Sequence, residues 1–447
     1  MAGSVGDDQA WRDTYLKPVV LLLLLNLISA TLFIIFVNRP VFDDGFNIYD
    51  VHNYAAKGFS LETLTAQRNP PGPTSFAWMA VAVRLIGGNE LRAARLGALF
   101  SWVLLGIGIL LGARFSRNPQ LWWAALLALL VFPHAVESAA IVLTEGPALL
   151  FALIGALVWT EFVSRADLGT RAFVMGVFGC LLMGVAVTCR QYFLALFPAA
   201  GLLAAYQRTR MAWGPSEKWR WAWHVFFALC LGAVPVLLLV LAWKGISSPG
   251  MQSGASYNMM YKAHAGLNFT RPVTAAFYVG LYLLPLTFPL MFKMKSAWRW
   301  GAFAVALLGG MAAAPFTKSL WQTGPLNSAV TAAARIPYGA NVVLAWIVAV
   351  TIYNAIALVV ALVDQKSLVK STPLVAFAVP TILFFVLEQF GVGGNIPFYD
   401  RYILQLAPFF GVIAFALLPR LDNARLTAIG GLSLFSHIML WRYVFTH

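Results

Sequence analysis

The fold class follows from residues 17–37, which read KPVVLLLLLNLISATLFIIFV. A helix needs about 20 predominantly apolar residues to cross a bilayer, and this run is long enough. No small-residue cleavage site follows it, so we expect a membrane span and not a cleaved signal peptide. Similar runs recur along the chain, which is 60% hydrophobic and only 11% charged, whereas about a quarter of the residues in soluble domains are charged. The sequence therefore predicts an all-α integral membrane protein in which residues 1–447 form one multispanning domain.

Apolar runs predict about 13 transmembrane helices. A further run, residues 73–88, has only about 15 residues, a proline-rich entry and Arg84 inside it, so we expect it to lie at the membrane interface as a juxtamembrane helix. The predicted spans are residues 17–37, 91–112, 120–134, 146–163, 172–189, 191–206, 222–243, 273–292, 300–315, 341–363, 372–388, 402–419 and 426–443.

The lysines and arginines indicate the orientation. If residues 73–88 do not cross, more than half of the basic residues fall on the N-terminal segment and six short loops of one side, which the positive-inside rule makes cytoplasmic. The net charge of +14 is then explained by these loops and their contacts with anionic membrane lipid, and it does not indicate nucleic-acid binding. Residues 38–90 become the first extracytoplasmic loop, with juxtamembrane helices.

Two adjacent acids, Asp43 and Asp44, follow the first span. A carboxylate at the bilayer boundary loses hydration unless it finds a partner, and two neighbouring carboxylates repel each other. Such a pair favours a general base or a metal ligand. The alternative is structural: the pair would cap a helix that begins near Phe46, or would pair with Arg39.

The residues after this pair follow a recognisable order. A run FNIYDVHNYAAKG ends in Gly58 before Phe59, Pro70 and Pro71 come next, and GGNELRAARL opens the second span. Roughly residues 1–165 resemble in this respect the GT-C class of membrane glycosyltransferases, such as the protein O-mannosyltransferases and the lipid A aminoarabinose transferase. The chain departs from that pattern in having Asp-Asp where Asp-Glu is usual. It also lacks the large extracytoplasmic C-terminal domain of some members.

The resemblance implies a hexosyl- or pentosyltransferase at the extracytoplasmic face of a bacterial cytoplasmic membrane. Such an enzyme moves a sugar, with inversion, from a polyprenyl-phosphate carrier to a hydroxyl of a lipid, glycan or protein acceptor. Asp43 matches the catalytic base of the class, and Asp44 would orient the acceptor or hold a metal. Glu145 matches an acid that helps some relatives to bind a divalent cation, so a Mg²⁺ or Mn²⁺ ion would lie between Asp44 and Glu145. The alternative for Glu145 is a favourable charge at a helix N-terminus, and Glu137 is the weaker candidate in the same loop.

A phosphate needs cationic partners, and arginine offers a planar, permanently charged one. Basic residues are sparse on the extracytoplasmic side, and each of them could instead reach lipid head groups or pair with an acid such as Asp400. The long loop 244–272 is a candidate lid that would contact the carrier through Tyr257, Tyr261 and Lys262. His52 and His264 would bind substrate or serve a structural role. The candidate arginines are Arg68, Arg92, Arg95, Arg190, Arg335 and Arg401.

Two other classes of protein remain open at this point. A transporter or flippase of a lipid-linked or amphipathic solute would typically show inverted repeats and charges near the bilayer midplane. We find no repeat, and the acids gather near predicted span ends. A lipid-linked glycan polymerase or ligase would favour arginines in a large outer loop over an acidic pair after the first span.

Overall fold

The computed structural model describes residues 5–445 except residues 42, 70–71, 166, 246, 253–269, 314–334, 337, 391–399 and 420. Every regular element among the described residues is a helix, so the predicted all-α class is confirmed. The first half of the chain forms α1 (Val5–Phe36), α2 (Asp44–Lys57), α3 (Leu61–Ala66), α4 (Pro73–Ile86), α5 (Glu90–Gly112), η1 (Ala113–Phe115), α6 (Pro119–Leu130), α7 (Ala135–Ala140), α8 (Glu145–Arg165), α9 (Thr170–Cys189), η2 (Gln191–Ala195), α10 (Leu196–Arg210) and α11 (Pro215–Trp243). The second half forms α12 (Pro249–Gln252), α14 (Thr270–Thr287), α15 (Pro289–Lys293), α16 (Ser296–Ala313), α18 (Gly339–Asp364), α19 (Lys366–Ser371), α20 (Pro373–Glu388), η5 (Asp400–Leu406), α21 (Ala407–Leu417) and α22 (Asn423–Phe445).

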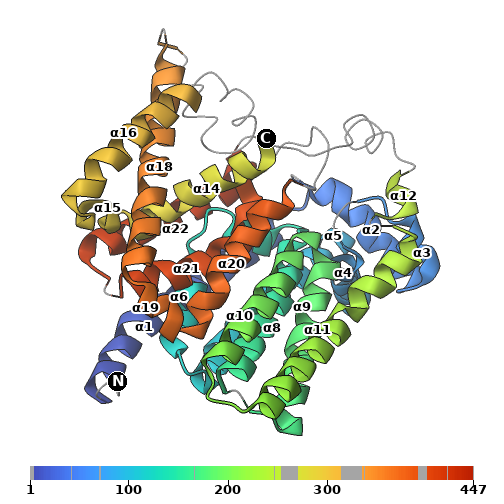
Figure 1. The fold of residues 1–447 in the computed structure, drawn as a ribbon. Helices are drawn as coiled ribbons and strands as arrows, with labels where there is room; N and C mark the ends of the chain where they lie inside the picture. The colour runs from blue at the N-terminus through green and yellow to red at the C-terminus, as the bar shows by residue number, and fades with distance from the viewer. Residues whose placement is uncertain are drawn as a thin grey trace.

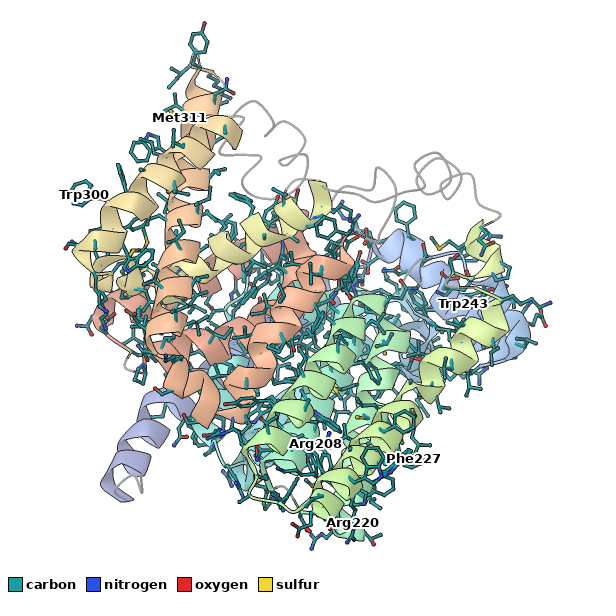
Figure 2. The ribbon with its side chains drawn as sticks, in the orientation of Figure 1. Arg208, Arg220, Phe227, Trp243, Trp300 and Met311 are labelled. Carbon is teal, nitrogen blue, oxygen red and sulfur yellow. The ribbon has the colours of Figure 1, made fainter. Side chains whose placement is uncertain are left out.

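The helices form one bundle with a projecting pair (Figure 1). α8, α9 and α11 pack side by side, while α16 and α18 pack on each other and project at the upper left. The chain begins at the lower end of the bundle, whereas α2, α3 and α12 lie towards the upper end. Figure 2 shows Arg208 and Arg220 at the lower end and Trp243, the last residue of α11, beside α3. The basic turn between α10 and α11 therefore lies at the opposite end from the acid-bearing turn that begins α2.

Each of the thirteen predicted apolar runs overlaps a helix of the described part of the chain, but not all of these helices are long. Six helices in the described part of the chain are long and apolar enough to cross a membrane. The run 120–134 is interrupted, because α6 ends at Leu130 and Pro133 cannot continue a helix. The chain is an integral membrane protein, and the count of thirteen spans is not confirmed. The six helices cover Leu16–Phe36, Glu90–Phe115, Glu145–Arg165, Thr170–Cys189, Pro215–Trp243 and Gly339–Asp364.

The predicted interfacial helix is α4. It has 14 residues, which at 1.5 Å per residue gives about 21 Å, less than the roughly 30 Å of a hydrocarbon core. One face packs on α2 and α5, while Val81, Leu85 and Ile86 on the opposite face are exposed. α4 is therefore shorter than a hydrocarbon core is thick and apolar on its exposed side, and its position at the membrane interface stays a prediction.

The molecule is most deeply buried around the segment between α6 and α8. Residues 122–150 are buried without interruption, including the predicted extracytoplasmic loop 134–146. This loop contains α7, which packs against α1, α5 and α22. It therefore forms part of the protein interior and does not run over the surface as a loop usually does.

Candidate active site

The predicted acid pair forms the entry to α2, and its two members lie in different environments. Asp43 is half-buried and occupies the N-cap position of α2, where its carbonyl oxygen accepts hydrogen bonds from the N–H groups of Phe46 and Asn47 at 3.1 and 2.9 Å. Its side chain makes no capping hydrogen bond. Asp44 is fully buried. The structural alternative of a side-chain cap therefore does not account for Asp43.

Asp44 is held by three N–H donors. Its Oδ2 accepts from the backbone of Val41 at 3.0 Å and from Arg95 Nη2 at 2.5 Å, and its Oδ1 accepts from the backbone of Val142 at 2.7 Å. Burial raises the pKa of the Asp44 carboxyl above its ordinary value, and the Arg95 guanidinium opposes that shift. The ion pair thus favours the charged form of a carboxyl group that burial alone would neutralise.

Arg95, predicted to bind substrate, instead closes the turn that carries the acid pair. Besides Asp44 it donates to the carbonyl oxygens of Val37 at 2.5 Å and Arg39 at 2.8 Å, and its side chain is buried. Arg39 thus contributes its carbonyl oxygen to this turn. Since both partners are engaged with each other, Asp44 and Arg95 position the turn in this structure.

The same turn forms hydrogen bonds with the buried segment before α8. Asp44 accepts from the N–H of Val142, and Asn47 Nδ2 donates to the carbonyl oxygen of Val142 at 2.6 Å. Glu145, the first residue of α8, follows Val142 by three residues. The first turn of α2 therefore fixes the segment that carries the second predicted acid.

A close backbone contact joins this region to the end of α9. The N–H of Gly72 donates to the carbonyl oxygen of Cys189 at 3.0 Å. A Cβ atom on Gly72 would lie 1.7 Å from the carbonyl oxygen of Thr188, so only glycine fits. Ser75 Oγ donates to the carbonyl oxygen of Thr144 at 3.2 Å. The start of α4, the end of α9 and the start of α8 therefore meet at one place.

The structure brings two of the predicted residues together there. Arg190 Nη2 lies 3.2 Å from Glu145 Oε1, and Arg190 Nη1 donates to Thr144 Oγ1 at 2.6 Å. Both charged side chains are buried. The guanidinium group also lies over the rings of Tyr192 and Tyr402, at 5.7 and 5.1 Å from their centroids. The Arg190 guanidinium is therefore a buried cation that contacts two aromatic rings and one carboxylate.

A second buried arginine, which the sequence reasoning did not single out, extends this centre. Arg271 in the first turn of α14 is 2% exposed. Its Nη2 donates to Tyr192 Oη and to Gln389 Oε1, each at 3.3 Å. Tyr192 thus contacts both arginines. Arg271 could have been recognised from its position immediately before Pro272 and an apolar run, because basic residues are sparse on the predicted extracytoplasmic side.

The other predicted ligand-binding residues lie elsewhere or outside the described part. His52 is exposed and pairs with Glu90 at 3.1 Å. Arg68 is exposed, 4.2 Å from the centroid of the Tyr49 ring. Arg92 Nη2 donates to the carbonyl oxygen of Ile35 at 2.9 Å, and Arg335 is exposed before α18. The residues outside the description are Pro70, Pro71, Tyr257, Tyr261, Lys262 and His264, together with the side chains of Asp400 and Arg401.

Glu137 belongs to a separate buried cluster. His134 Nδ1 lies 2.6 Å from Glu137 Oε2, and Arg442 Nη2 lies 3.6 Å from Glu137 Oε1. These contacts join α7 to α22. They fix the N-terminal end of the segment that leads to Glu145, so Glu137 has a structural role.

The predicted metal ligands are not arranged for a cation. Both oxygens of Asp44 accept N–H donors, and Glu145 pairs with Arg190. Among the residues that the structure describes, no group of three or more His, Cys, Asp or Glu side chains could hold a metal ion. The donor set therefore does not fit a divalent cation, and no metal enters the mechanism below.

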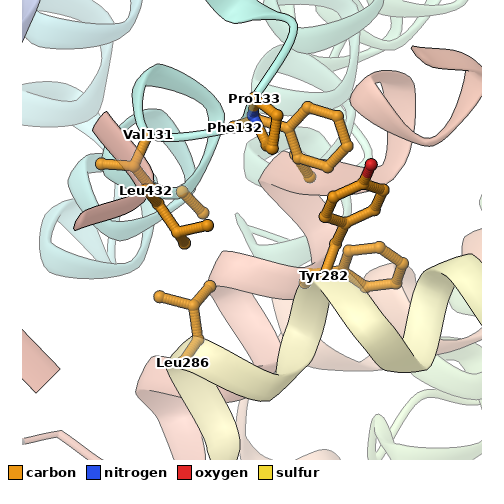
Figure 3. Close-up of a pocket in the computed structure, with 9 residues that line it drawn as sticks. Val131, Phe132, Pro133, Tyr282, Leu286 and Leu432 are labelled. Carbon is orange, nitrogen blue, oxygen red and sulfur yellow. The ribbon is translucent and has the colours of Figure 1, made fainter. Parts of the chain in front are cut away.

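Two hollows of the described part of the chain do not include Arg190 or Arg271 in their linings. Figure 3 shows a small cavity lined by Val131, Phe132, Pro133, Tyr282, Leu286 and Leu432. An open groove of about 490 Å³ lies alongside, between α14, α15, α18 and α22. Leu432 lines both. Their linings carry no charged side chain, so neither fits a phosphate or a sugar.

Comparisons with known proteins give structural matches only. No protein-family model matches the chain, and no curated protein matches it. The crystal structure of ArnT from Cupriavidus metallidurans in the apo state is 18% identical, covering 95% of this chain and 77% of that chain, with a TM-score of 0.39. The same protein bound to undecaprenyl phosphate gives 17% identity, 95% and 78% coverage, and a TM-score of 0.41.

A second matched protein is the oligosaccharyltransferase of Archaeoglobus fulgidus in the apo form. It is 10% identical over 84% of this chain and 56% of that chain, with a TM-score of 0.36. ArnT and this oligosaccharyltransferase are both GT-C enzymes, the class that the motifs of this chain resemble. Similarity at these TM-scores carries no conclusion about activity, which has to come from the site itself.

Proposed function

We propose that this protein is a membrane glycosyltransferase of the GT-C class. It moves a hexose or pentose from a polyprenyl-phosphate carrier to a hydroxyl group of a lipid, glycan or protein acceptor, at the extracytoplasmic face of a bacterial cytoplasmic membrane. One observation carries the proposal: a half-buried carboxylate, Asp43, and two buried arginines, Arg190 and Arg271, belong to one connected set of contacts.

The contacts that connect them run through named atoms. Asp44, next to Asp43, binds the N–H of Val142, and Thr144 two residues later accepts from Arg190 Nη1. Arg190 in turn lies over Tyr192, whose hydroxyl accepts from Arg271. A base and a cationic centre are thus positioned by one framework, as displacement of a phosphate leaving group requires.

The reaction follows from these groups. Asp43 accepts the proton of the acceptor hydroxyl, and the oxygen attacks the anomeric carbon from the face opposite the phosphate. The bond between that carbon and the phosphate oxygen breaks, and the electron pair leaves with the polyprenyl phosphate. Arg190 and Arg271 stabilise the released phosphate charge, so no strong acid is needed. The configuration at the anomeric carbon is inverted because one displacement occurs.

The test measures carrier binding and transfer separately. Wild type, Asp43→Asn, Arg190→Gln and Arg271→Gln are reconstituted in nanodiscs, and binding of undecaprenyl phosphate is measured by native mass spectrometry. We expect about tenfold weaker binding for each arginine variant, and unchanged binding but lost sugar transfer for Asp43→Asn. The matched control is Arg220→Gln at the opposite end of the bundle, where Arg220 donates to the carbonyl oxygen of Leu168.

Two results would overturn the proposal. Equal carrier binding by Arg190→Gln, Arg271→Gln and the control would remove the phosphate site. Transfer at the wild-type rate by Asp43→Asn would remove the base. Net movement of the intact glycosylated carrier between leaflets, without release of undecaprenyl phosphate, would favour the flippase class instead.

A further inference from the structure

Glu388 is a half-buried acid that the proposed mechanism does not use. It is the last residue of α20. Part of its side chain reaches the surface, but Oε1 is buried and has no hydrogen-bond partner among the described residues. The carboxylate accepts from the backbone N–H of Ala195, so it has a single donor in the described part of the chain.

The position of Glu388 is unfavourable for a carboxylate. The C-terminal end of a helix carries partial negative charge, which repels an anion. A buried carboxylate oxygen without a donor also loses the hydration that it had in the unfolded chain. A group that costs stability in this way calls for an explanation beyond folding.

Glu388 lies at the edge of the arginine centre. Its neighbour Gln389 accepts a hydrogen bond from Arg271. One turn earlier, the Phe385 ring lies 5.8 Å from the ring of Tyr192. The segment that donates to Glu388 is η2, which begins directly after Arg190. Glu388 is therefore next in the chain to a residue that binds Arg271, and it contacts the segment that follows Arg190.

We propose that Glu388 binds hydroxyl groups of the sugar that is attached to the carrier phosphate. A carboxylate oxygen accepts hydrogen bonds from hydroxyl groups, which every sugar carries. The arginines then recognise the phosphate, which every carrier has, and Glu388 recognises the sugar. This inference rests on the proposed function and assigns the sugar-binding part of the same site.

The experiment separates sugar recognition from carrier recognition. Glu388→Gln keeps the shape and one acceptor oxygen for the Ala195 N–H, but it removes the charge. In nanodiscs, binding of undecaprenyl phosphate is compared with binding of its mannosyl, glucosyl and galactosyl derivatives. We expect wild type to prefer one derivative over the bare carrier, and the variant to bind that derivative about tenfold more weakly. Binding of the bare carrier should not change, and thermal stability should stay equal or rise, because an unfavourable charge is removed.

A structural role would give the opposite pattern. Lower thermal stability of Glu388→Gln with unchanged sugar preference would overturn the inference, as would equal wild-type affinity for the bare and glycosylated carriers. If the sugar preference disappears when EDTA removes divalent cations, Glu388 would act through a bound metal and not by direct contact with hydroxyl groups. That result would also overturn the inference. The control is Glu62→Gln, an exposed acid paired with Lys57. The proposed phosphate site is tested by binding of the bare carrier to Arg190→Gln, and the proposed sugar site by the sugar preference of Glu388→Gln. The two proposals can therefore fail separately.

Discussion

The two adjacent aspartates should respond differently to the same substitution. In Asp44→Asn one oxygen remains and an amide NH₂ replaces the other, yet three N–H donors, from Val41, Arg95 and Val142, point at this group. At least one buried donor loses its acceptor, which costs about 1–3 kcal/mol. The buried Arg95 also loses its counter-charge, and breaking such a pair costs about 3–5 kcal/mol. The two terms describe overlapping contacts, so we expect a total of about 3–5 kcal/mol rather than their sum.

Asp43→Asn should behave as a surface substitution. Asp43 is half-buried and its side chain does not cap α2, so the free energy of unfolding should change by at most about 1 kcal/mol. Its sugar-transfer activity should nevertheless be lost. Asp44→Asn should lose activity only together with folded protein, because its loss loosens the turn that carries Asp43.

The assay is equilibrium unfolding of both variants in mixed micelles, with detergent-solubilised yield and thermal stability as second readouts. Glu62→Gln is the control for removal of an exposed acid in the same helical hairpin. If Asp44→Asn lies within about 1 kcal/mol of wild type, or if Asp43→Asn is destabilised equally, the assignment of different tasks to the two residues is refuted.

Three further outcomes are expected. Gly72→Ala should cost roughly 3 kcal/mol or more in unfolding free energy, because a Cβ 1.7 Å from the Thr188 carbonyl forces backbone movement; a wild-type melting temperature would contradict this contact. Tyr192→Phe keeps the rings packed but removes one of the two acceptors of the buried Arg271 Nη2, so the affinity for undecaprenyl phosphate should fall by about two- to tenfold and the melting temperature should fall slightly; identical binding would exclude a role for the hydroxyl. The Lys57 hydrogen bond lowers the pKa of Glu62, so the stabilisation is present above the ordinary pKa of glutamate and is lost as the pH falls through the lowered value. The melting temperatures of wild type and Glu62→Gln should therefore converge as the pH falls below the ordinary pKa of glutamate, and a constant difference would contradict the lowered pKa.

The helical runs and the position of the acid pair could be predicted from the sequence, because both depend on local pattern. Runs of apolar residues predict helices whatever their neighbours, and α2 does begin at the predicted acids. The sequence could not separate the tasks of Asp43 and Asp44. That difference depends on Arg95, which lies 51 residues further along the chain.

Most residues of the candidate site could be predicted from the sequence, but which of them contact each other could not. Glu145 and Arg190 were both candidates, but their pairing depends on how α8 packs against α9. Arg271 was missed because its importance comes from Tyr192 and Gln389, which lie 79 and 118 residues away. Residues 134–146 were predicted only as an extracytoplasmic connection between two spans, whereas Arg442 of the last helix pairs with Glu137 in the interior.

The burial of residues 122–150 has a practical consequence for topology mapping. Cysteines introduced between α6 and α8 would resist a membrane-impermeant thiol reagent from either face, and a tag inserted there would disrupt folding. Two sequential labelling steps, before and after denaturation, would be needed to detect this connection, and without them the chain would be assigned two crossings too few.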